Sequence, residues 1–109
     1  MPKITNAQIV DSLWTATENG RVDWQPTATK DQFAASFGGK WTVVIDKTET
    51  DRDDEFWLDV RDSEGQTIVR VAGATNPNIP DLFEMARRRG LKVDESLADF
   101  LKEIDSSSE

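Results

Sequence analysis

The chain contains no cysteine, no histidine and no tyrosine among its 109 residues. Without cysteine it can form no disulfide, no zinc–thiolate site and no thiol nucleophile. Without histidine it lacks the usual general base near neutral pH and the commonest transition-metal ligand. We therefore expect no catalytic residue, no metal site and no cofactor, and we expect the protein not to be an enzyme.

Long apolar stretches are also missing. Residues 1–6 show no apolar run like that of a signal peptide. No stretch of the chain approaches the roughly 20 apolar residues that a membrane-spanning helix needs. These absences predict a cytoplasmic location, including the cytoplasm of a host if the gene is viral.

The charge is unbalanced: 13 Lys and Arg residues stand against 21 Asp and Glu residues, for a formal net charge of −8. Such a field repels nucleic acid and anionic lipid and attracts a basic protein surface. It also keeps a small domain in solution. The expected partner is another protein with a basic surface, and neither nucleic acid nor a membrane.

The length suits one domain with its own hydrophobic core. We expect a single α+β domain over residues 1–105 and a flexible tail over residues 106–109, where the sequence is three serines and a glutamate.

Helical periodicity occurs at both ends of the chain. Residues 6–18 place apolar side chains on one side, after a possible cap at Thr5 or Asn6, and Gly20 suits the end of that helix. A second helix is expected to run from Pro80 to Gly90. A third follows it, with i, i+3, i+4, i+7 spacing at Leu97, Phe100, Leu101 and Ile104.

Between these helices apolar residues recur at every second position, which is typical of strands. A three-residue turn at residues 38–40 places Phe37 opposite Trp41, Ala35 opposite Val43 and Phe33 opposite Ile45, with all the large apolar residues on one face. Continuing the same test pairs Ile45 with Phe56 and Leu58 with Val69. The predicted fold is therefore α+β: an antiparallel four- to five-stranded meander, with the N-terminal helix and both C-terminal helices packed on one face.

The order of these pieces resembles a loose group of short uncharacterised bacterial and phage proteins. The residues that carry the resemblance are a run at 20–27 (GRVDWQPT), a turn at 62–65 (DSEG), a run at 80–88 (PDLFEMARR) and a run at 93–97 (VDESL). The resemblance covers nearly the whole chain and implies the fold. Its motifs are structural, so it implies no activity.

Trp57 is expected on the sheet face opposite the core, because it alternates with Phe56 and Leu58. The predicted pairings place Val44 and Arg70 opposite it, with Ile68 nearby. This composition is typical of an interface hot spot, which could serve a homodimer. The alternative is a local stack of Trp57 and Arg70 that shields the strands.

Residues 46–55 are predicted to form a long acidic hairpin loop, which includes Asp51, Asp53 and Asp54. The EF-hand pattern fails there because the required glycine and flanking helices are missing. A solvated hairpin tip and a contact arm for a basic partner both remain open. The basic run at 87–89 lies at the end of a predicted helix, where cations complement the helix dipole, although it could also dock an anion.

These patterns favour a small acidic, non-enzymatic protein-interaction domain. It would use the face around Trp57, with Arg70, Val44 and Ile68, and the acidic loop as a second contact. One alternative is an acidic inhibitor of the phage type that mimics nucleic acid. Another is a subunit of an enzyme, which would need a pocket that holds carboxylates beside a tryptophan.

Overall fold

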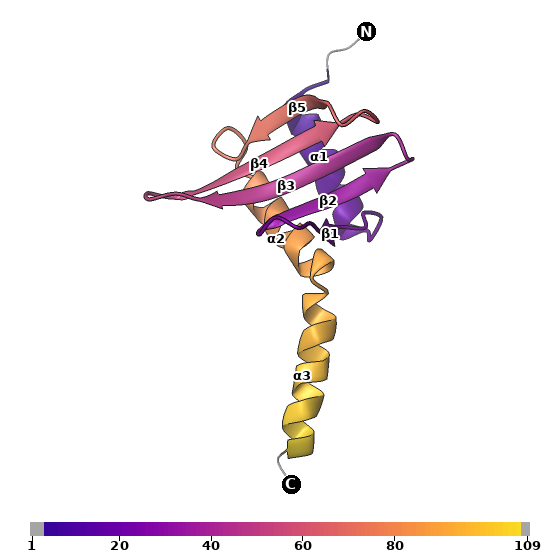
Figure 1. Cartoon of the computed structure of the whole chain (residues 1–109), viewed down its shortest axis with the longest axis vertical. Helices are drawn as coiled ribbons and strands as arrows, with labels where there is room; N and C mark the ends of the chain where they lie inside the picture. Colours follow the sequence, from indigo (N-terminus) through magenta and orange to yellow (C-terminus); the bar gives the residue numbers. More distant parts are fainter. Residues whose placement is uncertain (1–3, 108–109) are drawn as a thin grey trace.

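One antiparallel sheet of five strands forms the body of the molecule (Figure 1). The computed structural model describes residues 4–107, without the side chains of Asp94 and Ser107. The strands are paired in chain order, as a meander. The described elements are α1 (Asn6–Glu18), β1 (Gln25–Pro26), β2 (Gln32–Phe37), β3 (Trp41–Glu49), β4 (Asp54–Arg61), β5 (Thr67–Ala72), α2 (Ile79–Gly90) and α3 (Val93–Ser107). The predicted α+β class and antiparallel meander are confirmed.

The start of α1 is defined by a capping box. The Thr5 hydroxyl accepts a hydrogen bond from the backbone N–H of Gln8 at 3.2 Å, and the Gln8 side chain accepts one from the backbone N–H of Thr5 at 2.7 Å. Two backbone donors at the helix start are satisfied in this way. The helix runs over residues 6–18, as the sequence predicts.

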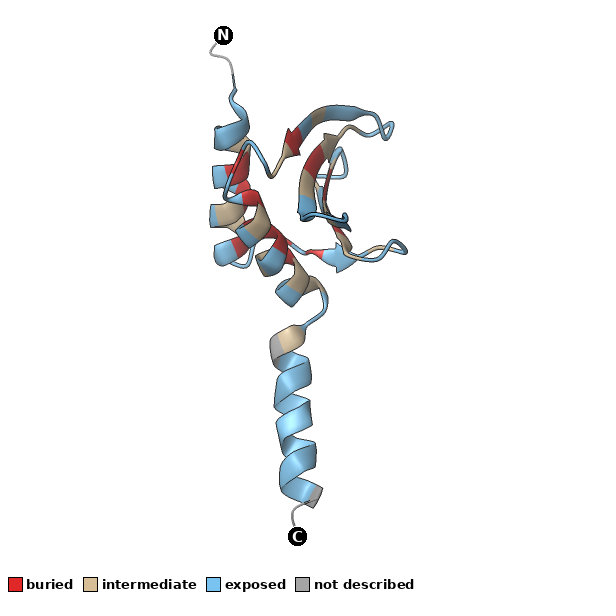
Figure 2. Cartoon of the chain, turned by 90° about the vertical axis from the view of Figure 1, so that its left-hand side faces the viewer, coloured by how far each residue is buried: buried red, intermediate tan, exposed pale blue. Residues whose placement is uncertain are grey.

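The hydrophobic core lies between the sheet and a layer made by α1 and α2. Figure 2 shows the buried residues gathered where these two helices face the strands. The helices contribute Val10, Leu13, Leu82, Phe83 and Ala86, and the strands contribute Phe33, Ala35, Val43, Ile45, Leu58 and Val71. Trp24, just before β1, is fully buried in the same cluster. Among the described residues, no helix lies on the opposite face of the sheet, which we call the outer face (Figure 2).

The predicted register of β2 and β3 is confirmed. Phe37 lies opposite Trp41, Ala35 opposite Val43 and Phe33 opposite Ile45. The turn between the strands contains Gly38 and Gly39, both with positive φ (60° and 69°). Glycine adopts this conformation without steric cost, which closes the turn in the predicted register.

The predicted register of β3 and β4 is wrong by two residues. Ile45 lies opposite Leu58 rather than Phe56, and Val43 opposite Val60. A shift of two leaves every side chain on its predicted face, so the hydrophobic pattern could not choose between the registers. The local turn decides: the Thr50 N–H donates to the Asp53 carbonyl at 3.2 Å. The predicted ten-residue loop is thus mostly strand, with a short tip at residues 50–53.

The predicted register of β4 and β5 is also two residues off, since Leu58 lies opposite Val71 rather than Val69. A register shift between Val60 and Arg61 marks a β-bulge. The turn that follows is held by Asp62, whose carboxylate accepts hydrogen bonds from the backbone of Glu64 and of Gln66. The bulge inserts Ile68 as an extra residue in β5, so pairing residues one by one from the turn gives the wrong partners.

The third helix, α3, does not pack on the sheet, so this part of the prediction is wrong. It extends away from the body, and its main contact is with α2 (Figures 1 and 2). Its apolar residues Leu97, Phe100, Leu101 and Ile104, which we call the α3 stripe, are between 44% and 59% exposed. Only Leu91 and Lys92 connect α2 to α3, and Lys92 has a left-handed φ of 52°, which turns the chain away. The helix continues to Ser107, so the first half of the predicted tail is helical, and residues 108–109 lie outside the described residues.

Candidate functional site

Trp57 lies on the outer face and is covered in part by Arg70. The guanidinium carbon of Arg70 is 4.3 Å from the centroid of the Trp57 ring, which is a cation–π geometry. The two residues are not directly opposite, because Trp57 faces Ala72 on β5 and Asp46 on β3. The predicted stack is therefore present, but it forms on the diagonal, and Trp57 is half-buried.

Val44 is buried, although the sequence predicts it as part of an exposed apolar patch. Its strand neighbour is Asp59, whose side chain is also buried. Asp59 lies between two arginines, with Oδ2 3.5 Å from Nη2 of Arg61 and Oδ1 3.7 Å from Nε of Arg70. The centre of the outer face is therefore a buried carboxylate beneath two solvent-exposed arginines, and only Ile68, at the side of β5, remains as an exposed aliphatic of the predicted patch.

Asp46 stands beside this cluster, opposite Trp57. Partial burial raises the pKa of its carboxyl above the ordinary value of 3.8, and the nearby charge of Asp59 acts in the same direction. A hydrogen bond with Gln32 and the positive charges of Arg70 and Arg61 oppose this rise. No hydrogen bond from a described residue reaches Oδ1 of Asp59. The carboxylates of Asp46 and Asp59 thus both lie close enough to Arg61 and Arg70 to interact with their charges.

Trp57 and two of the three predicted hairpin acids, Asp53 and Asp54, line the same hollow. The sequence patterns did not indicate that these residues lie together. We call this depression the Trp57 hollow, and its volume is about 620 Å³. Its floor and sides are largely apolar, and three exposed acidic residues stand at its border. Its lining residues are Asp53, Asp54, Glu55, Phe56, Trp57, Ala72, Gly73, Ala74 and Pro80. Asp51 is exposed at the hairpin tip and does not line it.

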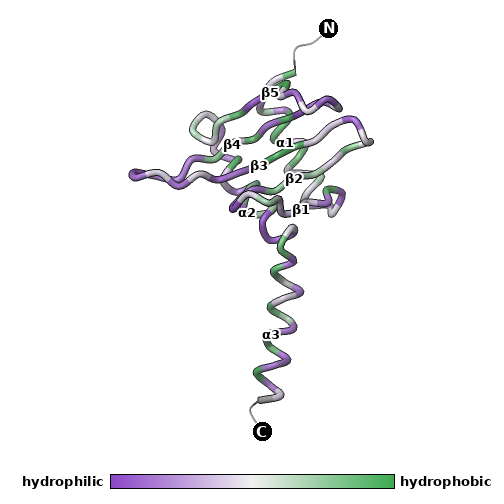
Figure 3. Tube along the Cα trace, viewed as in Figure 1, coloured by the Kyte–Doolittle hydropathy of each residue, from purple (hydrophilic) through white to green (hydrophobic). Residues whose placement is uncertain are grey.

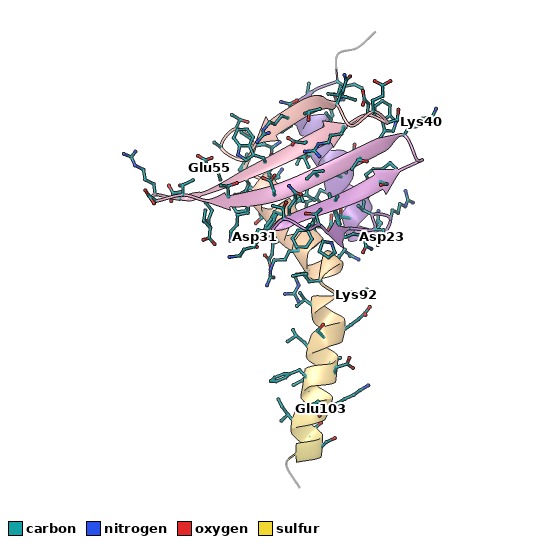
Figure 4. All side chains as sticks on the ribbon, viewed as in Figure 1. Asp23, Asp31, Lys40, Glu55, Lys92 and Glu103 are labelled. Atoms are coloured by element: carbon teal, nitrogen blue, oxygen red, sulfur yellow. The ribbon has the colours of Figure 1, made fainter. Side chains whose placement is uncertain are left out.

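The hollow exists because β4 is longer than β5. The strand β5 ends at Ala72, opposite Trp57, and the N–H of Gly73 then donates to the Phe56 carbonyl at 2.7 Å. A Cβ on Gly73 would lie 2.9 Å from that of Phe56, so only glycine fits this crossing. Asp54 and Glu55 lie beyond it and pair with β3 alone. Figure 4 shows Glu55 at this end of the sheet, near the projecting hairpin.

The arginine run at 87–89 forms the last turn of α2. Arg87 forms an ion pair with Glu84 at 2.9 Å, and Arg89 donates to the backbone carbonyl of Glu18 at 3.5 Å. The Arg89 contact joins the ends of α1 and α2, the Arg87 pair lies within α2, and cations at this helix end complement its dipole. The arrangement favours the structural interpretation of this run.

A second depression, which we call the α1 groove, lies between α1 and the sheet. Its volume is about 610 Å³. Its apolar lining consists of Ile4, Ile9, Leu13 and Ala16 on the α1 side, and of Phe37, Trp41, Val43, Val60 and Val69 on the sheet. Trp41 has the predicted core-side orientation, but it is 46% exposed because none of residues 4–107 covers it fully. Hydrophobic core surface thus remains open to solvent here.

The described part of the chain holds no group of three or more Asp, Glu, His or Cys side chains placed to bind a metal ion. Within residues 4–107, no helix combines the length and the apolar character that a membrane span requires. The features that stand out are therefore the Trp57 hollow, the α1 groove and the α3 stripe. Comparison of the chain with protein-family models, with curated proteins and with solved structures found no match.

Proposed function

We propose that this domain is a non-enzymatic protein-interaction module that binds a basic segment of a partner protein in the Trp57 hollow. The observation that carries the proposal is the shared position of Trp57 and the hairpin acids Asp53 and Asp54 around one hollow. An apolar centre supplies affinity, and an acidic border selects and steers a basic partner. The net charge of −8 favours the same class of partner.

Lysine and arginine side chains match this hollow in two parts. Their aliphatic stems suit the apolar surface of Phe56, Trp57 and Pro80. Their cationic ends can reach the carboxylates of Asp53 and Asp54, which stand in solvent. Exposed charges of this kind contribute more to association rate and selectivity than to affinity.

The open edge of β4 gives the partner's backbone a place as well. The Phe56 carbonyl points toward β5, where it binds Gly73. By the two-residue period of a strand, the backbone of Asp54 faces the same side, beyond the end of β5. An extended peptide could add its own hydrogen bonds there, as in β-strand addition. We therefore expect an extended basic segment rather than a helix in this hollow.

The alternative of an enzyme subunit also needs carboxylates beside a tryptophan. In acid–base chemistry at least one carboxyl sits in a water-excluded cleft. Asp53, Asp54 and Glu55 are exposed at the border of the hollow instead. Binding therefore explains their position better than proton transfer does.

The test uses a peptide library displayed on phage, selected on the purified domain at low ionic strength. We expect enriched peptides that place Lys or Arg next to an aliphatic or aromatic residue. Trp57→Ala and the double variant Asp53→Asn/Asp54→Asn should each weaken binding of a selected peptide about ten-fold or more. The matched control is Asp11→Asn/Glu64→Gln, which makes the same charge change at exposed sites outside the hollow.

Circular dichroism of each variant completes the experiment. If Trp57→Ala unfolds the domain, Trp57 has a structural role. The double variant Asp53→Asn/Asp54→Asn is then the variant that tests peptide binding in the hollow. Failure to enrich basic peptides, or equal binding by the hollow variants and the control, would contradict the proposal.

A further inference from the structure

Two exposed apolar surfaces lie at opposite ends of this chain. One is convex: the α3 stripe on a helix that projects from the body. The other is concave: the α1 groove, which includes Trp41 and also Ile4, 70% exposed. Figure 3 shows hydrophobic and hydrophilic residues alternating along the turns of α3. Exposed apolar patches of this kind mark interaction sites in soluble proteins.

The described residues leave the α1 groove open. Figure 4 places Lys40, next to Trp41, at the end of the sheet away from α3, and it places Lys92 where α3 begins. After Lys92, whose φ is 52°, α3 leads away from the body and its main contact is with α2. Within the described residues, α3 therefore does not occupy the α1 groove of its own chain.

We propose that two copies of this chain form a two-fold dimer in which each α3 stripe docks in the α1 groove of the other copy. The molecule is 65 Å along its longest axis. At 1.5 Å per residue, the 15 residues of α3 extend about 22 Å, a third of that length. When two copies lie side by side in opposite directions, each α3 runs along the far third of the other body, where the α1 groove lies.

The size of the contact suits a stable dimer. Four large side chains on each helix have about half of their surface exposed. If each of these side chains buries roughly 90 Å² and covers an equal area of the groove, one docked helix buries roughly 700 Å² in all, and two-fold symmetry doubles this to roughly 1,400 Å². The total falls in the range of roughly 1,200–2,000 Å² that is usual for specific interfaces. A symmetric exchange of identical elements is also a common route to dimers.

Charge favours the groove over pairing of one α3 with another. The polar side of α3 carries Glu95, Asp99, Glu103 and Asp105 against the single cation Lys102. Two such helices side by side would repel each other. The α1 groove instead lies beside exposed Lys40 and the positive end of α1, whose first turn holds no acidic residue.

Sedimentation equilibrium of the full chain over a wide concentration range tests the dimer. We expect the wild type to dimerise. Phe100→Glu on α3 and Trp41→Glu in the groove should each raise the dimer dissociation constant about 100-fold. Ile4→Glu is a second groove variant, chosen because its high exposure keeps it from disturbing the core. The matched control is Asp99→Asn on the polar side of α3, which should dimerise at least as well as the wild type.

Three results would overturn the proposal. One is a wild type that stays monomeric at every concentration. Another is loss of the dimer with Phe100→Glu but not with either groove variant, which would indicate pairing of α3 with α3. The third is a dimer that resists all three variants. Trp57→Ala should leave the dimer intact, so failure here and failure of peptide binding at the Trp57 hollow can be told apart.

Discussion

A single buried hydrogen bond joins α1 to the segment before β1. The indole N–H of Trp24 donates to the Thr17 hydroxyl at 3.1 Å, and both residues are fully buried. A buried donor that loses its acceptor pays the full desolvation cost. This bond therefore matters more than an average one, because no water can replace the hydroxyl.

We expect Thr17→Val to lower the free energy of unfolding by about 1–3 kcal/mol, since valine has nearly the same shape but leaves the Trp24 N–H without an acceptor. Urea denaturation followed by tryptophan fluorescence measures the change. Thr17→Ser is the control, because it keeps the acceptor and loses only a methyl group. If serine proves more damaging than valine, packing rather than the hydrogen bond is the dominant contribution.

Asp46 provides a pH-dependent contribution at the outer face. Burial raises the pKa of Asp46 in the folded state above 3.8, so the folded protein keeps this proton at pH values where the unfolded chain releases it. The stabilisation is complete at low pH, below 3.8, and is lost as the pH rises through the raised pKa. At neutral pH the ionised carboxylate thus costs stability.

Asp46→Asn should therefore raise the melting temperature at pH 7 by a few degrees, and this gain should shrink toward zero near pH 3. The measurement is thermal unfolding of variant and wild type across that range. Asp11→Asn, at an exposed site, serves as the control. A lower melting temperature for Asp46→Asn at pH 7 would mean that attraction to Arg61 and Arg70 outweighs the cost of burial.

At the scale of elements, the sequence was informative about faces and less so about pairing. Alternation placed Phe56, Leu58 and Val60 on the core side and Trp57 on the outer side, as in the structure. Registers that differ by two residues satisfy this alternation equally, so β4 was paired wrongly with both neighbours. The β2–β3 pairing was correct because its two glycines allow one short turn.

The Trp57 hollow could not be predicted for the same reason. It depends on β4 extending beyond β5, which follows only from the true registers. The stack of Trp57 and Arg70 forms despite the error in the predicted register, because both side chains stay on the outer face. Val44 was misjudged because alternation gives a residue's face but not what covers it. The glycine after β5 was the available signal for the close crossing.

The helix α3 was predicted from its period, but its position was not. An amphipathic pattern shows that a helix has an apolar partner without showing whether that partner belongs to the same chain. The predicted packing on the sheet assumed that it does. The left-handed conformation of Lys92, which leads α3 away from the body, has no signal in the hydrophobic pattern.

A chain that ends at Lys92 should therefore keep its fold. The stripe residues of α3 are exposed, so at low protein concentration the melting temperature should change by no more than a few degrees. At high concentration the wild type should gain stability from dimerisation, while the shortened chain should not. Thermal unfolding at two concentrations checks both expectations. Loss of the folded state on shortening would show that α3 contributes to the core of its own chain.

At the scale of the whole molecule, the net charge of −8 affects the two proposed interactions in opposite ways. Two copies of the same acidic chain repel each other at long range, whereas a basic partner is attracted. Raising the ionic strength from about 0.01 M to about 0.15 M shortens the Debye length from about 30 Å to about 8 Å. Salt should therefore strengthen the dimer and weaken binding to the basic peptide.

The final prediction is this opposite salt dependence, measured for both equilibria in the same buffers. We expect the dimer dissociation constant to fall and the peptide dissociation constant to rise over that range of ionic strength. Phe100→Glu should be used for the peptide titration, because a monomer removes any linkage between the two equilibria. If the dimer instead loosens with salt, Lys40 and its surroundings dominate the contact over the net charge. If peptide binding is insensitive to salt, Asp53 and Asp54 do not contribute, and the apolar floor of the Trp57 hollow alone would account for the affinity.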